Sequence, residues 1–178
     1  MNTLLMILRA PRPSHRDHMQ VIVKPHWIRR GYDALTLFGT IITHNQQDAD
    51  AFRDTSVLYN HERIHLYQAR SCNDSWWLFY LRYAYYWLAA LPHTHHFRDA
   101  GYRLNPFEME AYANQHNLHY LDDKQAGANQ WRTYARMSLR ERRQALGTIK
   151  SAALTQPSQC QTVHPSEHHP PQTVSPSE

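Results

Sequence analysis

The longest apolar segment of this chain runs from Trp76 to Leu91 and reads WWLFYLRYAYYWLAAL. A membrane-spanning helix needs about 20 consecutive apolar residues, and this segment is shorter and carries Arg82 near its middle. We therefore predict a helix that packs in the core of a globular domain and ends before Pro92. Its Trp and Tyr side chains leave one alternative open, a helix lying on a membrane surface, because such rings favour the boundary between lipid and water.

Composition sets the class of protein. The chain has 178 residues, of which 42% are apolar, which suits one domain with a tail. Its formal net charge is +4, and its two cysteines are too few for a disulfide framework. The unusual feature is the presence of 14 histidines, since neutral imidazole binds transition metals near pH 7. The apolar run from Leu4 to Leu8 is too short for a secretory signal, so we expect a cytoplasmic protein.

The chain divides into four parts. Residues 1–19 mix Pro, Arg and His without periodicity and predict a flexible arm, whereas the Pro-, Ser- and His-rich residues 156–178 predict a disordered tail. Between them we expect an α+β domain over residues 20–121 and a basic helical extension over residues 122–155.

Short strand-like stretches precede the helices. Residues 21–23 and 35–43 are rich in β-branched and aromatic residues, which predicts a small sheet. Capping residues and apolar spacing predict the helices, which are expected from residue 57 to about 68, over 76–91, from Asn105-Pro106 to about 121, and over 131–150.

The sequence His61-Glu62-Arg63-Ile64-His65 lies in the first of these helices. Residues four apart lie on one face of a helix, so both imidazoles can bind one zinc ion. Glu62 would then lie beside a water that the metal polarises, as its general base. The pattern predicts zinc-assisted hydrolysis of a peptide bond. The alternative is a solvated helix in which two histidines have this spacing by coincidence.

A catalytic zinc usually has three protein ligands and one open position. The helix after Asn105 offers Glu108 and Glu110, which point about 200° apart, so only one can face the metal. Glu108 also has the position of a capping-box residue. Glu110 lies nearer the apolar stripe, and Asn114 one turn further on is placed to orient a ligand histidine. Helical geometry alone mildly favours Glu110.

The HExxH segment and the later Glu108-Met109-Glu110-Ala111-Tyr112 resemble the gluzincin metallopeptidases. They are especially similar to small gluzincin domains in which a helix reading ExxAD or ExEAD follows the HExxH helix, and to short bacterial proteins of minimal gluzincin type. The resemblance covers about residues 20–121 and implies a zincin-like fold. It also implies that Glu108, the first glutamate of the second motif, is the third zinc ligand, with Glu110 as the alternative. Tyr112 stands where that family has an aspartate that orients a zinc ligand.

A catalytic site would also need side chains that stabilise the transition state and a strand that holds the substrate. Stabilising an oxyanion needs a donor besides zinc, and spacing does not choose among Tyr102, Tyr112, His95 and His96. The two histidines are also further candidates for the third ligand. From the resemblance and their strand-like composition, residues 39–43 are expected to form an edge strand that holds an extended peptide or protein substrate.

The extension is strongly basic, with Glu141 its one acidic residue between Lys124 and Lys150. We expect a solvated appendage that binds no specific nucleic acid, because no base-reading motif accompanies the charge. The rival function is a noncatalytic protein stabilised by zinc, whose basic helix contacts an anionic membrane or nucleic-acid surface. The sequence does not indicate an oligomeric state.

Overall fold

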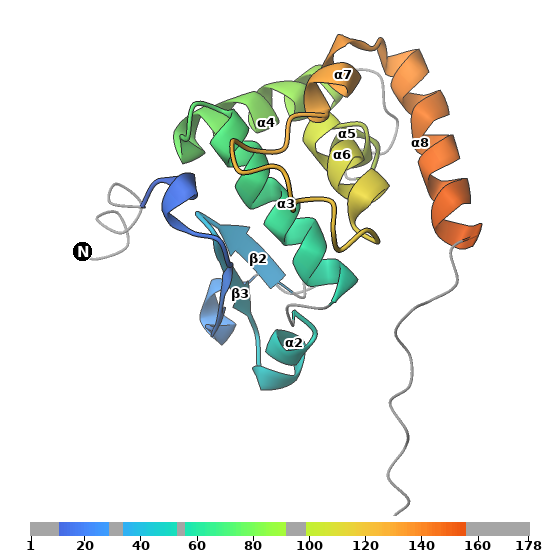
Figure 1. The fold of residues 1–178 in the computed structure, drawn as a ribbon. Coiled ribbons are helices and arrows are strands. Elements are labelled where there is room, and N and C mark those ends of the chain that lie inside the picture. Colours follow the sequence, from blue (N-terminus) through green and yellow to red (C-terminus); the bar gives the residue numbers. More distant parts are fainter. Residues whose placement is uncertain (1–10, 29–33, 53–55, 92–98, 156–178) are drawn as a thin grey trace, which may run out of the picture.

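The computed structural model describes residues 11–28, 34–52, 56–91 and 99–155 (Figure 1). It is a mixed α+β fold, as the sequence predicts, in which a small sheet lies beside a larger group of helices. In chain order the elements are η1 (Pro13–His15), β1 (Gln20–Val23), η2 (Pro25–Trp27), β2 (Ala34–Leu37), β3 (Thr40–Thr43), α2 (Gln46–Asp50), α3 (Val57–Ser71), α4 (Trp76–Ala90), α5 (Asp99–Arg103), α6 (Pro106–Asn114), α7 (Trp131–Arg136) and α8 (Leu139–Thr155).

The three strands are arranged in the order β1-β3-β2, with β3 parallel to β1 and antiparallel to β2. Residues 35–43 therefore form a hairpin rather than one strand. Its turn is Phe38-Gly39, where both residues have positive φ (49° and 75°), as a tight hairpin turn requires. Because β3 is the central strand, both of its edges are paired. The expectation that residues 39–43 form an edge strand for substrate is wrong.

Helix α3 begins as expected, because the Ser56 side chain accepts a hydrogen bond from the backbone N–H of Tyr59. Helix α4 begins in the same way at Ser75. It buries Trp76 and Phe79 in the core, as predicted for this segment, but its outer face leaves large side chains exposed, namely Trp77, Leu81, Tyr85 and Leu88. Among the described residues, no helix is long and apolar enough to cross a membrane.

Helix α6 ends at Asn114, earlier than the predicted end near residue 121. The Asn60 side chain on α3 donates hydrogen bonds to the carbonyl oxygens of Gln115 (2.8 Å) and Asn117 (3.2 Å), which satisfies backbone groups where the chain leaves the helix. The following turns cross α3 at Gly127, where φ is +115° and the backbone packs against Tyr67 and Ser71. Glycine is required at this crossing because a β-carbon would clash there.

The basic segment forms two helices instead of one. They separate at Ser138, which makes a reciprocal capping box with Glu141: the Ser138 N–H and hydroxyl donate to the Glu141 carboxylate, and the Glu141 N–H donates to the hydroxyl. Trp131 at the start of α7 is buried against Phe107, with ring centroids 4.5 Å apart. The core therefore continues past residue 121, the expected end of the domain.

The described part of the expected N-terminal arm, residues 11–19, also packs on the helices. Met19 is buried, and the Trp76 indole donates to the carbonyl oxygen of Pro11 (3.1 Å). Arg70 on α3 donates to the carbonyl oxygens of Pro13 and Arg16. These contacts hold residues 11–19 in place, whereas residues 1–10 and the expected disordered tail, 156–178, lie outside the described residues.

Candidate metal site between α3 and α6

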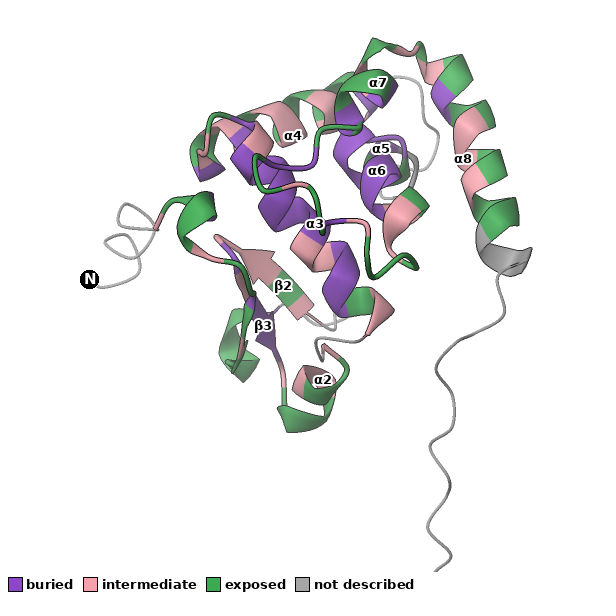
Figure 2. Cartoon of the chain, viewed as in Figure 1, coloured by how far each residue is buried: buried purple, intermediate pink, exposed green. Residues whose placement is uncertain are grey.

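His61 and His65 lie one turn apart on the buried face of α3, with 6% and 9% of their surface exposed. Helix α6 packs against this face, and most residues of both helices are buried (Figure 2). The His61 ring contacts the Tyr112 ring, with centroids 4.8 Å apart, and the His65 ring lies 6.1 Å from that of Phe79. The fold thus holds both imidazoles in an aromatic setting that limits their rotation.

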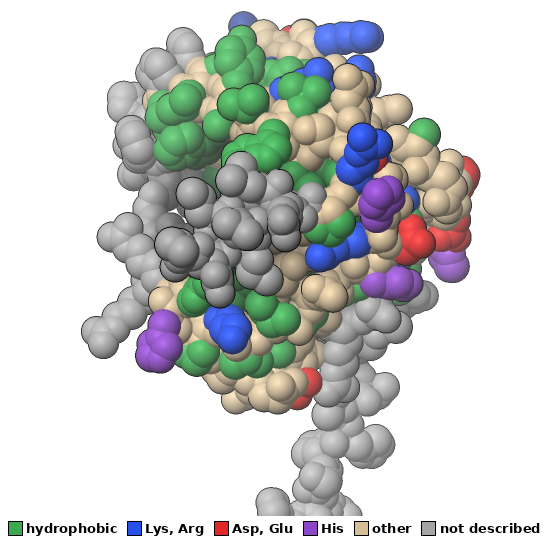
Figure 3. All heavy atoms as spheres, turned by 90° about the vertical axis from the view of Figure 1, so that its left-hand side faces the viewer, with side chains coloured by type: hydrophobic (Ala, Val, Ile, Leu, Met, Phe, Trp, Pro, Cys, Tyr) green, Lys and Arg blue, Asp and Glu red, His purple; other side chains and the backbone are tan. Residues whose placement is uncertain are grey.

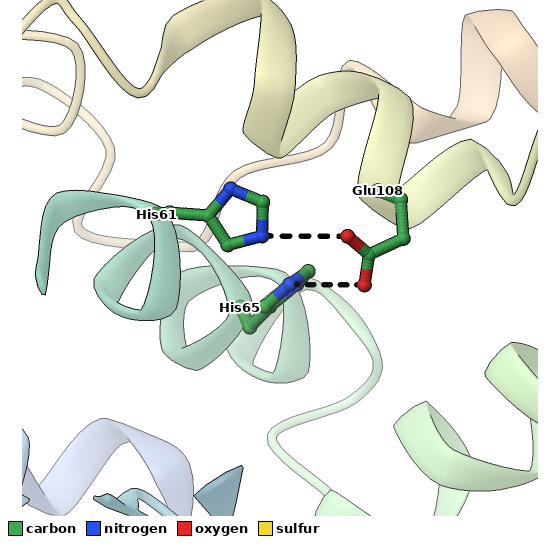
Figure 4. Close-up of side chains that lie close together, drawn as sticks. All are labelled: His61, His65 and Glu108. Carbon is green, nitrogen blue, oxygen red and sulfur yellow. Dashed lines mark ion pairs between the residues drawn. The ribbon is translucent and has the colours of Figure 1, made fainter. Parts of the chain in front are cut away.

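Glu108 on α6 points at both histidines (Figure 4). Its Oε2 atom lies 3.3 Å from His61 Nε2, and its Oε1 atom lies 3.4 Å from His65 Nε2. One ligand atom from each of the three residues lies within 4.8 Å of the others, the one such His/Cys/Asp/Glu group found in the described part of the chain. Ligands about 2.0–2.1 Å from a tetrahedral zinc ion are about 3.3–3.5 Å apart, so these spacings suit zinc.

The hydrogen bonds of Glu108 indicate that its site fits a cation. Its Oε1 atom accepts a hydrogen bond from the Tyr83 hydroxyl (2.7 Å). Its Oε2 atom is buried and has no hydrogen-bond partner among the described residues. A buried carboxylate oxygen without a donor is costly, and a metal ion would satisfy it. Two imidazole nitrogens and one carboxylate are also the donor set of many catalytic zinc sites.

The charges of this group are strongly coupled. Burial would raise the pKa of Glu108, but the nearby imidazoles of His65 and His61 outweigh it and hold that pKa well below its usual value. Burial likewise lowers the pKa of His65, yet the Glu108 carboxylate dominates and raises it to about 9. Without metal, His65 is therefore protonated at pH 7. A metal ion binding there would displace this proton.

Glu110 points away from the histidines and is fully buried among hydrogen-bond donors. Its carboxylate accepts four hydrogen bonds, two from side chains and two from backbone N–H groups. The donors are Gln68 Nε2 (2.9 Å), the Tyr120 hydroxyl (2.6 Å), Gln130 N (2.9 Å) and Trp131 N (3.0 Å). The structure therefore brings Glu108, and not Glu110, to His61 and His65. The carboxylate of Glu108 faces α3 and pairs with His61 and His65, so it does not have the capping-box role considered for it.

Glu62 follows His61 on α3 and is half-buried. Its negative charge contributes to raising the pKa of His65 and of Tyr83, which places its carboxylate within electrostatic reach of the metal group. Tyr112 and Tyr102 also lie beside the group, with ring centroids 6.4 Å apart. Burial and the charge of Glu108 raise the pKa of both tyrosines, so both keep their hydroxyl protons at neutral pH. His95 and His96 lie outside the described residues.

Two glutamines that we did not predict contact the histidines. Gln68 Oε1 lies 2.7 Å from His65 Nδ1, and Gln115 Oε1 lies 3.0 Å from His61 Nδ1. These contacts leave the Nε2 atom of each ring directed at Glu108. Asn114, which we expected to orient a histidine, instead donates to the Glu110 carbonyl oxygen and to the Gln130 side chain. Gln68 is three residues after His65 on the same helix face, and this spacing indicates that their side chains can meet.

No family model, curated protein or solved structure gives a significant match to this chain. The function is therefore inferred from the geometry of His61, His65 and Glu108, together with the gluzincin resemblance of their motifs.

Proposed function

We propose that this protein is a zinc metallopeptidase of gluzincin type, in which His61, His65 and Glu108 bind the metal. The observation that carries the proposal is the convergence of these three buried side chains, with a Glu108 oxygen that lacks a hydrogen-bond donor. Three protein ligands leave one position of a tetrahedral ion open, as in catalytic rather than structural zinc sites.

When bound, zinc would act as a Lewis acid toward water and the substrate carbonyl. Glu62 would take a proton from the attacking water on its carboxylate as the water oxygen bonds to the carbonyl carbon. It would return that proton to the amide nitrogen as the C–N bond breaks. Glu62 follows His61 on α3 and is half-buried, and its charge acts on His65, which supports this role.

Neighbouring side chains support this assignment. Tyr83 holds Glu108 by a 2.7 Å hydrogen bond, and Tyr102 and Tyr112 offer protonated hydroxyls beside the site as candidates for stabilising an oxyanion. In the resembling family, an aspartate at the position of Tyr112 orients a zinc ligand. In this chain the side chain of Gln115 contacts the ligand His61 instead. The departure at Tyr112 is therefore compatible with an oriented ligand.

The test compares the zinc-loaded protein with its Glu62→Gln variant on a mixture of unstructured peptides, using mass spectrometry to detect cleavage. We expect cleavage by the wild type that stops with chelator and falls at least about 100-fold in Glu62→Gln. The variant should keep its fold and its zinc, because Glu62 is not among the ligands. Equal cleavage by both proteins would show a contaminating protease and refute the proposal.

The second candidate is a noncatalytic, zinc-stabilised protein that contacts an anionic membrane or nucleic acid. It is favoured by the exposed basic side chains on α7 and α8, which include Arg132, Arg136, Arg140 and Lys150. Figure 3 shows the side of the molecule turned away from α8, where hydrophobic side chains gather and Lys and Arg are scattered. Zinc binding without any peptide cleavage, together with salt-sensitive binding to anionic vesicles or DNA, would favour it. The cytoplasmic location stays a prediction, to be tested by cell fractionation.

A further inference from the structure

We propose that Gln68 is a positioning residue that fixes which nitrogen His65 presents to the metal, through a chain of hydrogen bonds that starts at the backbone of residues 130 and 131. This inference rests on the proposed zinc site and deepens it. The chain passes from the backbone to Glu110, from Glu110 to Gln68, and from Gln68 to His65.

The first link is Glu110, whose two oxygens both act as acceptors. Gln130 N and Trp131 N are backbone donors whose direction cannot be reversed, and they contact different oxygens of the carboxylate, Oε1 and Oε2. Trp131 N donates to Oε2, the same oxygen that lies beside Gln68, which makes this oxygen an acceptor. Glu110 therefore requires a donor from Gln68, at 2.9 Å from its Oε2 atom.

The second link is the orientation of the Gln68 amide. Its nitrogen lies 2.9 Å from two acceptors, Glu110 Oε2 and the carbonyl oxygen of Phe107. A flipped amide would place an oxygen against both acceptors, so only one orientation is compatible with these neighbours. The Gln68 side chain is fully buried, which excludes water as an alternative partner. Its Oε1 atom must therefore face His65.

The third link is the proton on His65. Gln68 Oε1 is an acceptor only and lies 2.7 Å from His65 Nδ1, so Nδ1 must carry a proton. Nε2, which faces Glu108 at 3.4 Å, is therefore the nitrogen that gives up its proton when a metal binds. The chain of hydrogen bonds thus prepares His65 to bind metal through Nε2 before any metal arrives.

The corresponding contact at His61 is less firmly held. Gln115 is only half-buried, and its amide nitrogen lies 3.3 Å from the ring of the exposed His116 rather than from fixed acceptors. Gln115 can therefore reorient, and water can replace it. This difference makes Gln115 a matched control for Gln68.

The experiment measures zinc affinity by competition with a chromophoric chelator. It uses the full chain with the tail histidines His164, His168 and His169 changed to Ser, so that the tail does not compete. Methionine at either glutamine keeps the length of the side chain and removes its hydrogen bonds. We expect Gln68→Met to weaken zinc binding by about 10–100-fold, the usual cost of losing a residue that orients a ligand, and Gln115→Met to weaken it less.

A second readout separates positioning from a merely structural role and does not depend on whether Gln68→Met folds. In ¹⁵N-labelled wild-type protein with zinc bound, long-range ¹H–¹⁵N spectra should show His65 protonated at Nδ1 and coordinated through Nε2. Zinc affinity of a folded Gln68→Met within twofold of wild type, or coordination of His65 through Nδ1, would overturn the inference. Failure of the wild type to bind zinc at all would instead refute the proposed function.

Discussion

The role of Glu110 gives a sharp test of the hydrogen bonds behind the site. In Glu110→Gln, one acceptor oxygen becomes an NH₂ group. If the NH₂ group takes the place of Oε2, it faces two donors, Gln68 Nε2 and Trp131 N. If it takes the place of Oε1, the Tyr120 hydroxyl can rotate to accept from it, and only the N–H of Gln130 is left without an acceptor. We expect the second arrangement.

The cost can be estimated from this arrangement. The N–H of Gln130 is only partly buried, so losing its acceptor costs about 0.5–1.5 kcal/mol, and the remaining bonds lose about 1 kcal/mol in all when the acceptor is no longer charged. We therefore expect a loss of about 1.5–2.5 kcal/mol in the free energy of unfolding. Urea unfolding at pH 7 with chelator present measures it.

Glu141→Gln is the matched control, because Glu141 is exposed and only caps α8, so this variant should lose less stability than Glu110→Gln. At saturating zinc, Glu110→Gln should still bind one ion, since its oxygens face away from the histidines. Glu108→Gln should lose zinc binding. Two results would contradict these expectations. One is a Glu110→Gln variant that is no less stable than Glu141→Gln, and the other is a loss of zinc in Glu110→Gln while Glu108→Gln keeps it.

Three further predictions concern stability. Gly127→Ala should lower the free energy of unfolding by at least about 3 kcal/mol, because φ is +115° and a β-carbon would clash with the backbone nitrogen of Ser71. Gly147→Ala, with nothing within 4 Å, should raise it by about 0.5–1 kcal/mol. Equal melting temperatures for the two variants would contradict this. Arg142→Met should cost about 2–3 kcal/mol, because the buried guanidinium donates to three backbone carbonyl groups, whereas exposed Arg140→Met should change urea unfolding by less than about 0.5 kcal/mol. Without zinc, the free energy of unfolding should fall as the pH rises from 6.5 to 9. Although burial lowers the pKa of His65, Glu108 raises it to about 9 in the folded protein, so this stabilisation is complete below pH 6.5 and is lost as the pH passes 9. A flat pH profile would contradict this.

The sequence predicted those parts of the fold that depend on neighbours along the chain. The start of α3 follows from the capping side chain of Ser56, and the shared helix face of His61 and His65 follows from their spacing. The break at Ser138 also had a local signal, the capping box with Glu141, which our prediction of one continuous basic helix passed over.

Features that depend on how elements pack could not be derived from local patterns. Helical geometry favoured Glu110 as a ligand, and only the way α6 crosses α3 turns Glu108 to the histidines. The end of α6 depends on Asn60, which lies far away in sequence and binds the carbonyl oxygens beyond the helix. The spacing of Gln68 after His65 indicated that the two can meet, but the orientation of the Gln68 amide depends on its partners from α6.

The central claim is that one zinc ion binds to His61, His65 and Glu108. The most direct measurement is elemental analysis of metal in the purified full chain, prepared without an affinity tag and with Ser at the three tail histidines. We predict about one zinc per chain, and its loss in both His61→Ala and Glu108→Gln, with each variant still folded by circular dichroism. A folded wild type that contains no zinc and takes up none when it is added would contradict the account.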